Sequence, residues 1–153
     1  DFDSTVILSS SNGLSYSNSI LYISQNIGPT FSVNIPQKGS FGISIDAGSN
    51  FITIGSKGYV TMPYDGTIID WQIIGNLNGD IQVDIKKSSY LNYPTTTSIT
   101  NGNYIGMTSS YKNNDNILYN WSLNFSKNDV FEFIVISTSN LNKANIVLST
   151  LKY

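Results

Sequence analysis

The amino-acid sequence predicts an all-β protein, and composition is the first reason. Ala and Glu, two strong helix formers, occur at two positions and one position among 153 residues, whereas Ile, Thr, Tyr and Phe are abundant. Short apolar runs recur at spacings of roughly 8–12 residues, and turn-forming residues separate them, as is typical of sandwiches and barrels. We therefore expect a jelly-roll-like antiparallel β-sandwich over residues 37–153, preceded by a β-hairpin or fibre-type segment over residues 1–36.

Residues 1–36 contain two apolar runs, at 5–8 and 20–23, on either side of Asn12-Gly13. Because Asn-Gly favours the tight turn of a β-hairpin, these two runs are predicted to pair. A hairpin of this size is marginally stable in water by itself. We expect it to pack on the main domain or on another chain.

Alternation of apolar and polar residues marks the strands that follow. Apolar side chains recur at every second position in 31–35 and 41–45, and two shorter apolar runs lie at 51–54 and 59–62. The Pro and Gly within residues 63–66 then favour a turn, since Pro fixes φ and Gly permits φ above zero. These four segments are the strands expected before that turn.

The strongest local pattern spans residues 67–87. Apolar residues dominate 68–74 and alternate with polar residues in 81–85, and Asn78-Gly79 lies between the two runs. This arrangement predicts a β-hairpin that turns at Asn78-Gly79. Further strands are expected in four apolar or alternating segments: 104–108, 121–125, 130–136 and 145–151.

Two of these segments, 68–74 and 130–136, have apolar side chains on both faces of the strand. The outer face of a sandwich normally meets water, so we expect a further surface to cover these strands. A neighbouring subunit and the N-terminal 36 residues are the two candidate covers. Trp71 and Trp121 alternate in phase with buried positions, and both are expected in the core.

The chain lacks most of the side chains that enzymes use. It has no His, Cys or Arg and a single Glu, Glu132, whereas catalysis near neutral pH depends largely on His, on Cys or on carboxylates with shifted pKa values. We expect no catalytic residue and no cofactor. Glu132 is expected to face solvent from a strand, although glycoside hydrolysis by Glu132 and an Asp partner stays open as an alternative.

Charge and carboxylate spacing argue against several other classes of function. The Asp residues are scattered, mostly at turns that they can cap, so no metal site is expected, and only a calcium-type oxygen site would be compatible with this composition. A net charge of −2, with Lys86-Lys87 as the one adjacent basic pair, predicts no nucleic-acid binding. No apolar run approaches the roughly 18 residues of a membrane span, so no membrane insertion is expected. Since the sequence starts at Asp1, we expect a processed product or an excised C-terminal piece.

Tyr and Asn residues from position 90 onward are the candidate binding residues. Sugar recognition commonly uses an exposed aromatic ring as an apolar platform, with amide, carboxylate or backbone groups that hydrogen-bond the sugar hydroxyls. Binding residues also concentrate in loops. The candidate glycan contacts are Tyr90, Asn92, Tyr93, Tyr111, Asn113, Asp115 and Tyr119.

Several segments resemble bacteriophage tail-fibre and virion appendage proteins. Residues 58–71 are similar to a family pattern Gly-x-Val-x-x-Pro-Phe-x-x-x-Ile-x-x-Trp, and residues 79–87 resemble the strand that follows it. Residues 90–94 resemble the family's aromatic-Pro loop, and residues 128–133 its Gly-Asp-hydrophobic strand. Residues 8–24 are similar to a tail-fibre module that starts with a Ser- and Asn-rich turn. Together these segments cover most of the chain.

The chain departs from the family at three places. Lys86 stands where the family has Trp, Asn128 stands where it has Gly, and residues 22–24 replace the usual terminal triplet of the tail-fibre module. Every matching segment is a strand or turn signature, so the resemblance carries over no binding residue.

The resemblance implies a β-sandwich tip or appendage on the outer face of a virion. Such domains are usually homotrimers that contact other virion proteins and host surface polysaccharide, and the implied function is non-enzymatic attachment to host-cell glycans. One alternative is a structural capsid or tail decoration domain without a ligand. The other is a carbohydrate-binding module or adhesin that a bacterium secretes or displays on its surface.

Overall fold

The computed structural model describes residues 13–17, 20–24 and 31–153, and every regular element in them is a β-strand. The strands pair antiparallel, and the sheet of the larger unit curls into a sandwich-like form, so the predicted all-β antiparallel fold is confirmed. The chain divides into two units, residues 1–37 with residue 153, and residues 38–152.

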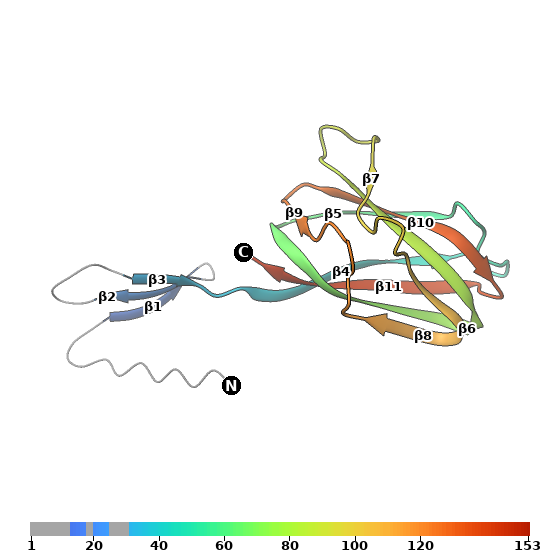
Figure 1. Cartoon of the computed structure of the whole chain (residues 1–153), viewed down its shortest axis with the longest axis horizontal. Helices are drawn as coiled ribbons and strands as arrows, with labels where there is room; N and C mark the ends of the chain where they lie inside the picture. Colours follow the sequence, from blue (N-terminus) through green and yellow to red (C-terminus); the bar gives the residue numbers. More distant parts are fainter. Residues whose placement is uncertain (1–12, 18–19, 25–30) are drawn as a thin grey trace. The chain divides into compact units, whose positions relative to one another are not determined.

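The first unit contains a three-stranded sheet in the order β1, β2, β3 (Figure 1). Its strands are β1 (Gly13–Ser17), β2 (Ile20–Ser24) and β3 (Phe31–Asn34). The predicted strand at 20–23 is confirmed as β2. The predicted turn at Asn12-Gly13 is wrong, because Gly13 lies within β1 and pairs with Ser24. The apolar run at 5–8 lies outside the described residues.

The larger unit is one eight-stranded sheet that curls over on itself. The path of hydrogen-bonded strands runs β4, β11, β6, β10, β5, and three further strands pair with β6. The bounds are β4 (Gln37–Asp46), β5 (Lys57–Thr61), β6 (Gly66–Ser88), β7 (Thr97–Ser98), β8 (Ile105–Asp115), β9 (Asn124–Phe125), β10 (Val130–Ser139) and β11 (Lys143–Lys152).

Strand β6 belongs to both layers of the sandwich. Its residues 66–75 pair with β11 in the first layer, and its residues 80–88 pair with β10 in the second. Figure 1 shows the ribbon of β6 turning back between these two halves. The predicted hairpin at 68–85 is therefore wrong, since the two halves pair with β11 and β10 and both pair with β8, and their apolar residues join one core.

Two glycines allow the chain to bend inside β6. A Cβ atom on Gly75 would meet the side chains of Met107 and Leu141, and one on Gly79 would meet the Ser139 carbonyl oxygen and Leu141. Leu141 is fully buried. The turn between β10 and β11 thus packs into the space that the two glycines leave open, as expected for a glycine at a close backbone approach.

Polar side chains hold the same bend. The Oδ1 atom of Asn76 accepts hydrogen bonds from the backbone N–H groups of residues 142 and 143, at 3.2 and 2.9 Å. The carboxylate of Asp80 accepts the backbone N–H of Ser109 and the hydroxyl of Ser139, each at 2.7 Å. Asn and Asp are common in turns, but here their side chains join β6 to neighbouring segments and do not close a hairpin.

The core contains the residues that alternation predicted, with local exceptions. Trp71 is buried as expected, and Trp121 is partly buried and packs against the core. Residues 51–54 form no strand, and within them Ile52 is buried while Phe51 and Ile54 are exposed. The segment expected at 104–108 is the start of the longer strand β8. Of the segment expected at 121–125, two residues form β9.

Candidate functional site

The candidate site starts with the outer face of β5 and β10. Val130 pairs with Thr61 and Glu132 pairs with Tyr59, so these side chains lie on the same face of the sheet. The residue between them, Phe131, points into the core and is fully buried. The buried inward side chains therefore anchor the sheet to the core, and the outward side chains project from that anchored sheet.

The connection from β6 to β7 supplies the opposite wall. Immediately after β6, the backbone N–H groups of residues 92 and 93 both bond to the Ser89 carbonyl at 3.1 Å, and that of residue 95 bonds to the carbonyl of residue 92 at 3.0 Å. This compact turn brings Tyr90 and Tyr93 to the outer face of β5 and β10.

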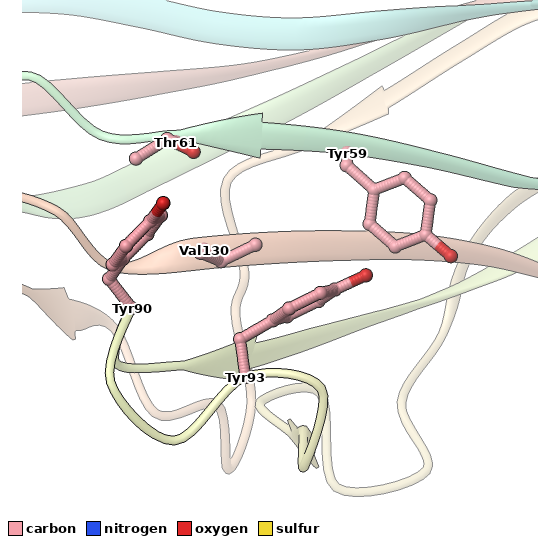
Figure 2. Close-up of a pocket in the computed structure, with 5 residues that line it drawn as sticks. All are labelled: Tyr59, Thr61, Tyr90, Tyr93 and Val130. Atoms are coloured by element: carbon pink, nitrogen blue, oxygen red, sulfur yellow. The ribbon is translucent and has the colours of Figure 1, made fainter.

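The two walls enclose an open pocket of about 470 Å³, which we name the tyrosine pocket. Figure 2 shows Val130 at its centre, with Tyr59 and Thr61 on the side of β5 and Tyr90 and Tyr93 on the side of the loop. The volume lies within the roughly 300–1,000 Å³ of small-molecule sites, which are mostly apolar with a few polar groups. Three aromatic rings and a hydroxyl side chain match that description.

The rings combine apolar surface with free hydrogen-bonding groups. The Tyr59 and Tyr93 rings meet edge to face, with centroids 6.1 Å apart and planes at 88°, an arrangement that aromatic pairs favour. Tyr90 is 67% exposed, so its ring is open to a ligand. The hydroxyls of Thr61 and Tyr90 make no hydrogen bond to the described residues.

Glu132 lies beside the pocket and is buried, with 5% of its surface exposed. The prediction that it faces solvent is wrong, because the ammonium of Lys57 lies 3.2 Å from its Oε2 atom and stabilises a charge that is shielded from water. The hydrogen bond to Glu132 raises the pKa of Lys57. Burial raises the pKa of Tyr59, and the Glu132 charge raises it further.

A second buried carboxylate, Asp84, belongs to β6 and lies on the same outer face of the sheet as Glu132. Its Oδ1 atom accepts hydrogen bonds from the hydroxyls of Ser98 and Thr100, both at 2.7 Å. Neither Asp84 nor Glu132 is among the residues that line the tyrosine pocket. In the described part of the chain, no group of three or more acidic side chains could hold a metal ion.

The predicted glycan contacts divide between several places. Tyr90 and Tyr93 line the tyrosine pocket, whereas Asn92 lines a neighbouring polar hollow of about 390 Å³. Tyr111, Asn113 and Asp115 belong to β8, and Asn113 lines a smaller hollow of about 220 Å³ between β6 and β8. The structure thus brings only two of the seven predicted residues together in one pocket.

The remaining candidate, Tyr119, lies in the connection between β8 and β9. Its carbonyl accepts a hydrogen bond from the Asn103 side chain at 3.1 Å, and its ring is exposed. A hollow of about 480 Å³ lies nearby around Trp121 and Leu123. The Trp121 indole N–H already donates to the Asn103 carbonyl at 3.0 Å, so the polar group of that aromatic ring is engaged within the protein.

Sequence reasoning missed Tyr59, Thr61 and Val130, because all three lie in predicted strands rather than in loops. A usable signal was present in the alternation of β5. If Val60 faces the core, Tyr59 and Thr61 must face outward. An outward tyrosine on a strand is a binding candidate when a loop packs against it.

No family model matches this chain, and a search of curated proteins gives no match to it. The described part of the chain also contains no helix with the length and apolar character that crossing a bilayer requires.

Proposed function

We propose that this chain is a non-enzymatic attachment domain that binds cell-surface glycans in the tyrosine pocket. The observation that carries the proposal is the meeting of three tyrosines from two elements around an open pocket of about 470 Å³. The apolar face of a sugar ring packs against aromatic rings, and its hydroxyls need hydrogen-bonding groups beside those rings.

The pocket offers both kinds of contact. Tyr90 presents an exposed ring, and Val130 adds an aliphatic surface at the centre. The hydroxyls of Thr61 and Tyr90, with no partner among the described residues, can exchange hydrogen bonds with sugar hydroxyls. Tyr59 and Tyr93 restrain one another through their ring contact, which reduces the entropy lost when a ligand binds.

The proposal places the domain on a virion fibre or appendage, as a homotrimer that contacts other virion proteins and a host polysaccharide. The support for this setting is the resemblance of residues 58–71 and 79–87 to tail-fibre and appendage proteins. Sedimentation equilibrium of the full chain should give three times the chain mass. A molecular mass equal to that of a single chain at all protein concentrations would contradict the trimer.

A glycan array tests the binding function. The full chain should bind a defined set of glycans, and Tyr90→Ala should weaken that binding at least about tenfold, since loss of an aromatic hot spot costs about 2 kcal/mol or more and about 1.4 kcal/mol is tenfold. Tyr119→Ala is the matched control, because the two tyrosines are 67% and 69% exposed. It should bind as the unchanged chain does.

The outcomes separate the proposal from its alternatives. Equal binding by both variants would place the ligand elsewhere. No binding to any glycan or to host cells would favour a structural decoration domain. Cleavage of a bound glycan that is lost in Glu132→Gln would restore the glycoside hydrolase alternative.

A further inference from the structure

The tyrosine pocket has a lining without charge, which bears on the class of sugar it binds. Its five lining residues are tyrosine, threonine and valine. A carboxylate that leaves water for such a surface needs a cation or several hydrogen-bond donors, because an unpaired charge loses its hydration without compensation. The cations around the pocket therefore decide whether it accepts an acidic sugar.

Lys57 is the cation on the strand that carries Tyr59, two residues before it on the same face. Its ammonium is paired with Glu132 at 3.2 Å, and the Glu132 side chain is only 7% exposed. If Lys57 turned to a ligand, it would leave a buried carboxylate without its partner, which is strongly unfavourable. The ion pair thus withholds Lys57 from the pocket.

The two lysines at the end of β6 also lie outside the pocket lining. Lys87 lies 3.4 Å from the carboxylate of Asp129 and donates to the Asn124 carbonyl at 2.7 Å. Lys86 pairs in register with Glu132, so strand β10 separates it from Tyr59. No lysine is among the residues that line the tyrosine pocket.

The effect of Glu132 reaches the pocket through Tyr59, its cross-strand neighbour. The pKa of Tyr59 is raised first by burial and next by the Glu132 charge, and Lys57 offsets this only in part. The potential at the Tyr59 hydroxyl is therefore unfavourable to a second negative charge.

We infer that the tyrosine pocket selects neutral sugars and rejects sugars that carry a carboxylate, because the Glu132 and Lys57 ion pair removes the nearest cation. This inference rests on the proposed function and names the ligand class of the same site. The protein's net charge of −2 gives an acidic polysaccharide no long-range attraction that would compensate.

The test compares pairs of oligosaccharides that differ only at the carboxylate. The full chain is presented with oligosaccharides of galactose and galacturonate, and of glucose and glucuronate, each pair with the same linkage and length. In every pair that binds, the neutral member should bind on the order of tenfold more tightly, as one uncompensated charge interaction predicts.

Two variants should change this preference in a known direction. Glu132→Gln frees the Lys57 charge, so binding of the acidic members should rise by about tenfold while binding of the neutral members stays the same. Thr61→Lys places a new cation in the lining from an exposed strand position, and it should also strengthen acidic binding. The second variant keeps the test valid if the first fails to fold.

The results distinguish the two proposals. Acidic members that bind the unchanged chain as tightly as the neutral members would overturn the inference and leave glycan binding in place. Unchanged acidic binding in a folded Glu132→Gln and in Thr61→Lys would overturn it as well. Absence of binding to both members of every pair would overturn the proposed function, and the inference with it.

Discussion

Two regions of this molecule contain the same kinds of side chain, yet only one of them forms an aromatic pocket. In the first, Tyr90 and Tyr93 meet Tyr59 around the tyrosine pocket. In the second, Tyr111 and Asn113 lie on strand β8, beside a hollow of less than half that volume.

The difference lies in what faces each set of side chains. A loop packs against the outer face of β5 and β10, so the tyrosine rings point toward one another across a shared space (Figure 2). On β8, polar side chains bond to nearby backbone instead. Asn113 donates to the Gly106 carbonyl at 2.7 Å, and Asp115 accepts the backbone N–H of Ile117 at 2.8 Å. A binding residue therefore needs an opposing surface as well as the right chemistry.

The largest expected effect concerns the sheet behind the tyrosine pocket. Phe133 belongs to β10, and its side chain is fully buried in the core. Phe133→Ala should therefore lower the free energy of unfolding by about 3–5 kcal/mol. Tyr111→Ala, at an exposed position of β8, should change it by less than about 0.5 kcal/mol. Urea denaturation of the two variants measures both values. Similar losses would mean that the two regions do not differ in packing as described.

The second prediction compares strand tyrosines for binding. Tyr59→Ala should weaken binding of a neutral oligosaccharide by at least about tenfold, because it removes one wall of the tyrosine pocket. Tyr111→Ala should leave the affinity unchanged. Isothermal titration calorimetry measures both, and Tyr59→Phe separates the ring contact from the hydroxyl. A larger loss at Tyr111 would reverse the assignment of the two regions.

A smaller effect is expected for the two asparagines. The Asn113 side chain bonds the Gly106 carbonyl, so Asn113→Ala should lower the free energy of unfolding by about 0.5–1 kcal/mol. The side chain of Asn92 has no such bond to the described residues, and Asn92→Ala should have almost no effect on stability. Thermal unfolding by circular dichroism can rank the pair. An Asn92 variant that is the less stable of the two would contradict this distinction.

The smallest effect is a pH dependence at the bend in β6, between the two regions. Hydrogen bonds from the Ser139 hydroxyl and the Ser109 N–H lower the pKa of Asp80 from its ordinary value of 3.8. Because the folded pKa is the lower one, this stabilisation is complete above about pH 4 and is lost as the pH falls through the folded pKa.

Asp80→Asn should therefore be less stable than the unchanged chain at pH 6, and the difference should shrink on acidification below pH 4. Urea denaturation at several pH values measures it. A difference that stays constant with pH would show that the Asp80 charge contributes nothing.

The sequence alone could predict the features that depend on local pattern. Alternation located the core side of β10, and Trp71 is in the core as expected. The turn at Asn78-Gly79 could not be distinguished from a bend within one strand, because the local pattern is the same. The two halves form one bent strand because they pair with β11 and β10, which come much later in the chain.

The candidate site was predictable only in part for a similar reason. The sequence predicts Tyr90 and Tyr93 as loop aromatics, but Tyr59 becomes a site residue only when that loop packs against β5. The burial of Glu132 depends on Lys57, which is 75 residues away along the chain. Such long-range partners leave no local signal in the sequence.

The most direct test of the central claim is an NMR titration of the full chain with a neutral oligosaccharide that binds on the array. Signals of the residues that line the tyrosine pocket, Tyr59, Thr61, Tyr90, Tyr93 and Val130, should shift together and saturate at one affinity. Signals of Tyr111, Asn113, Asp115 and Tyr119 should stay in place. Shifts confined to this second group would contradict the assignment of the tyrosine pocket as the glycan site.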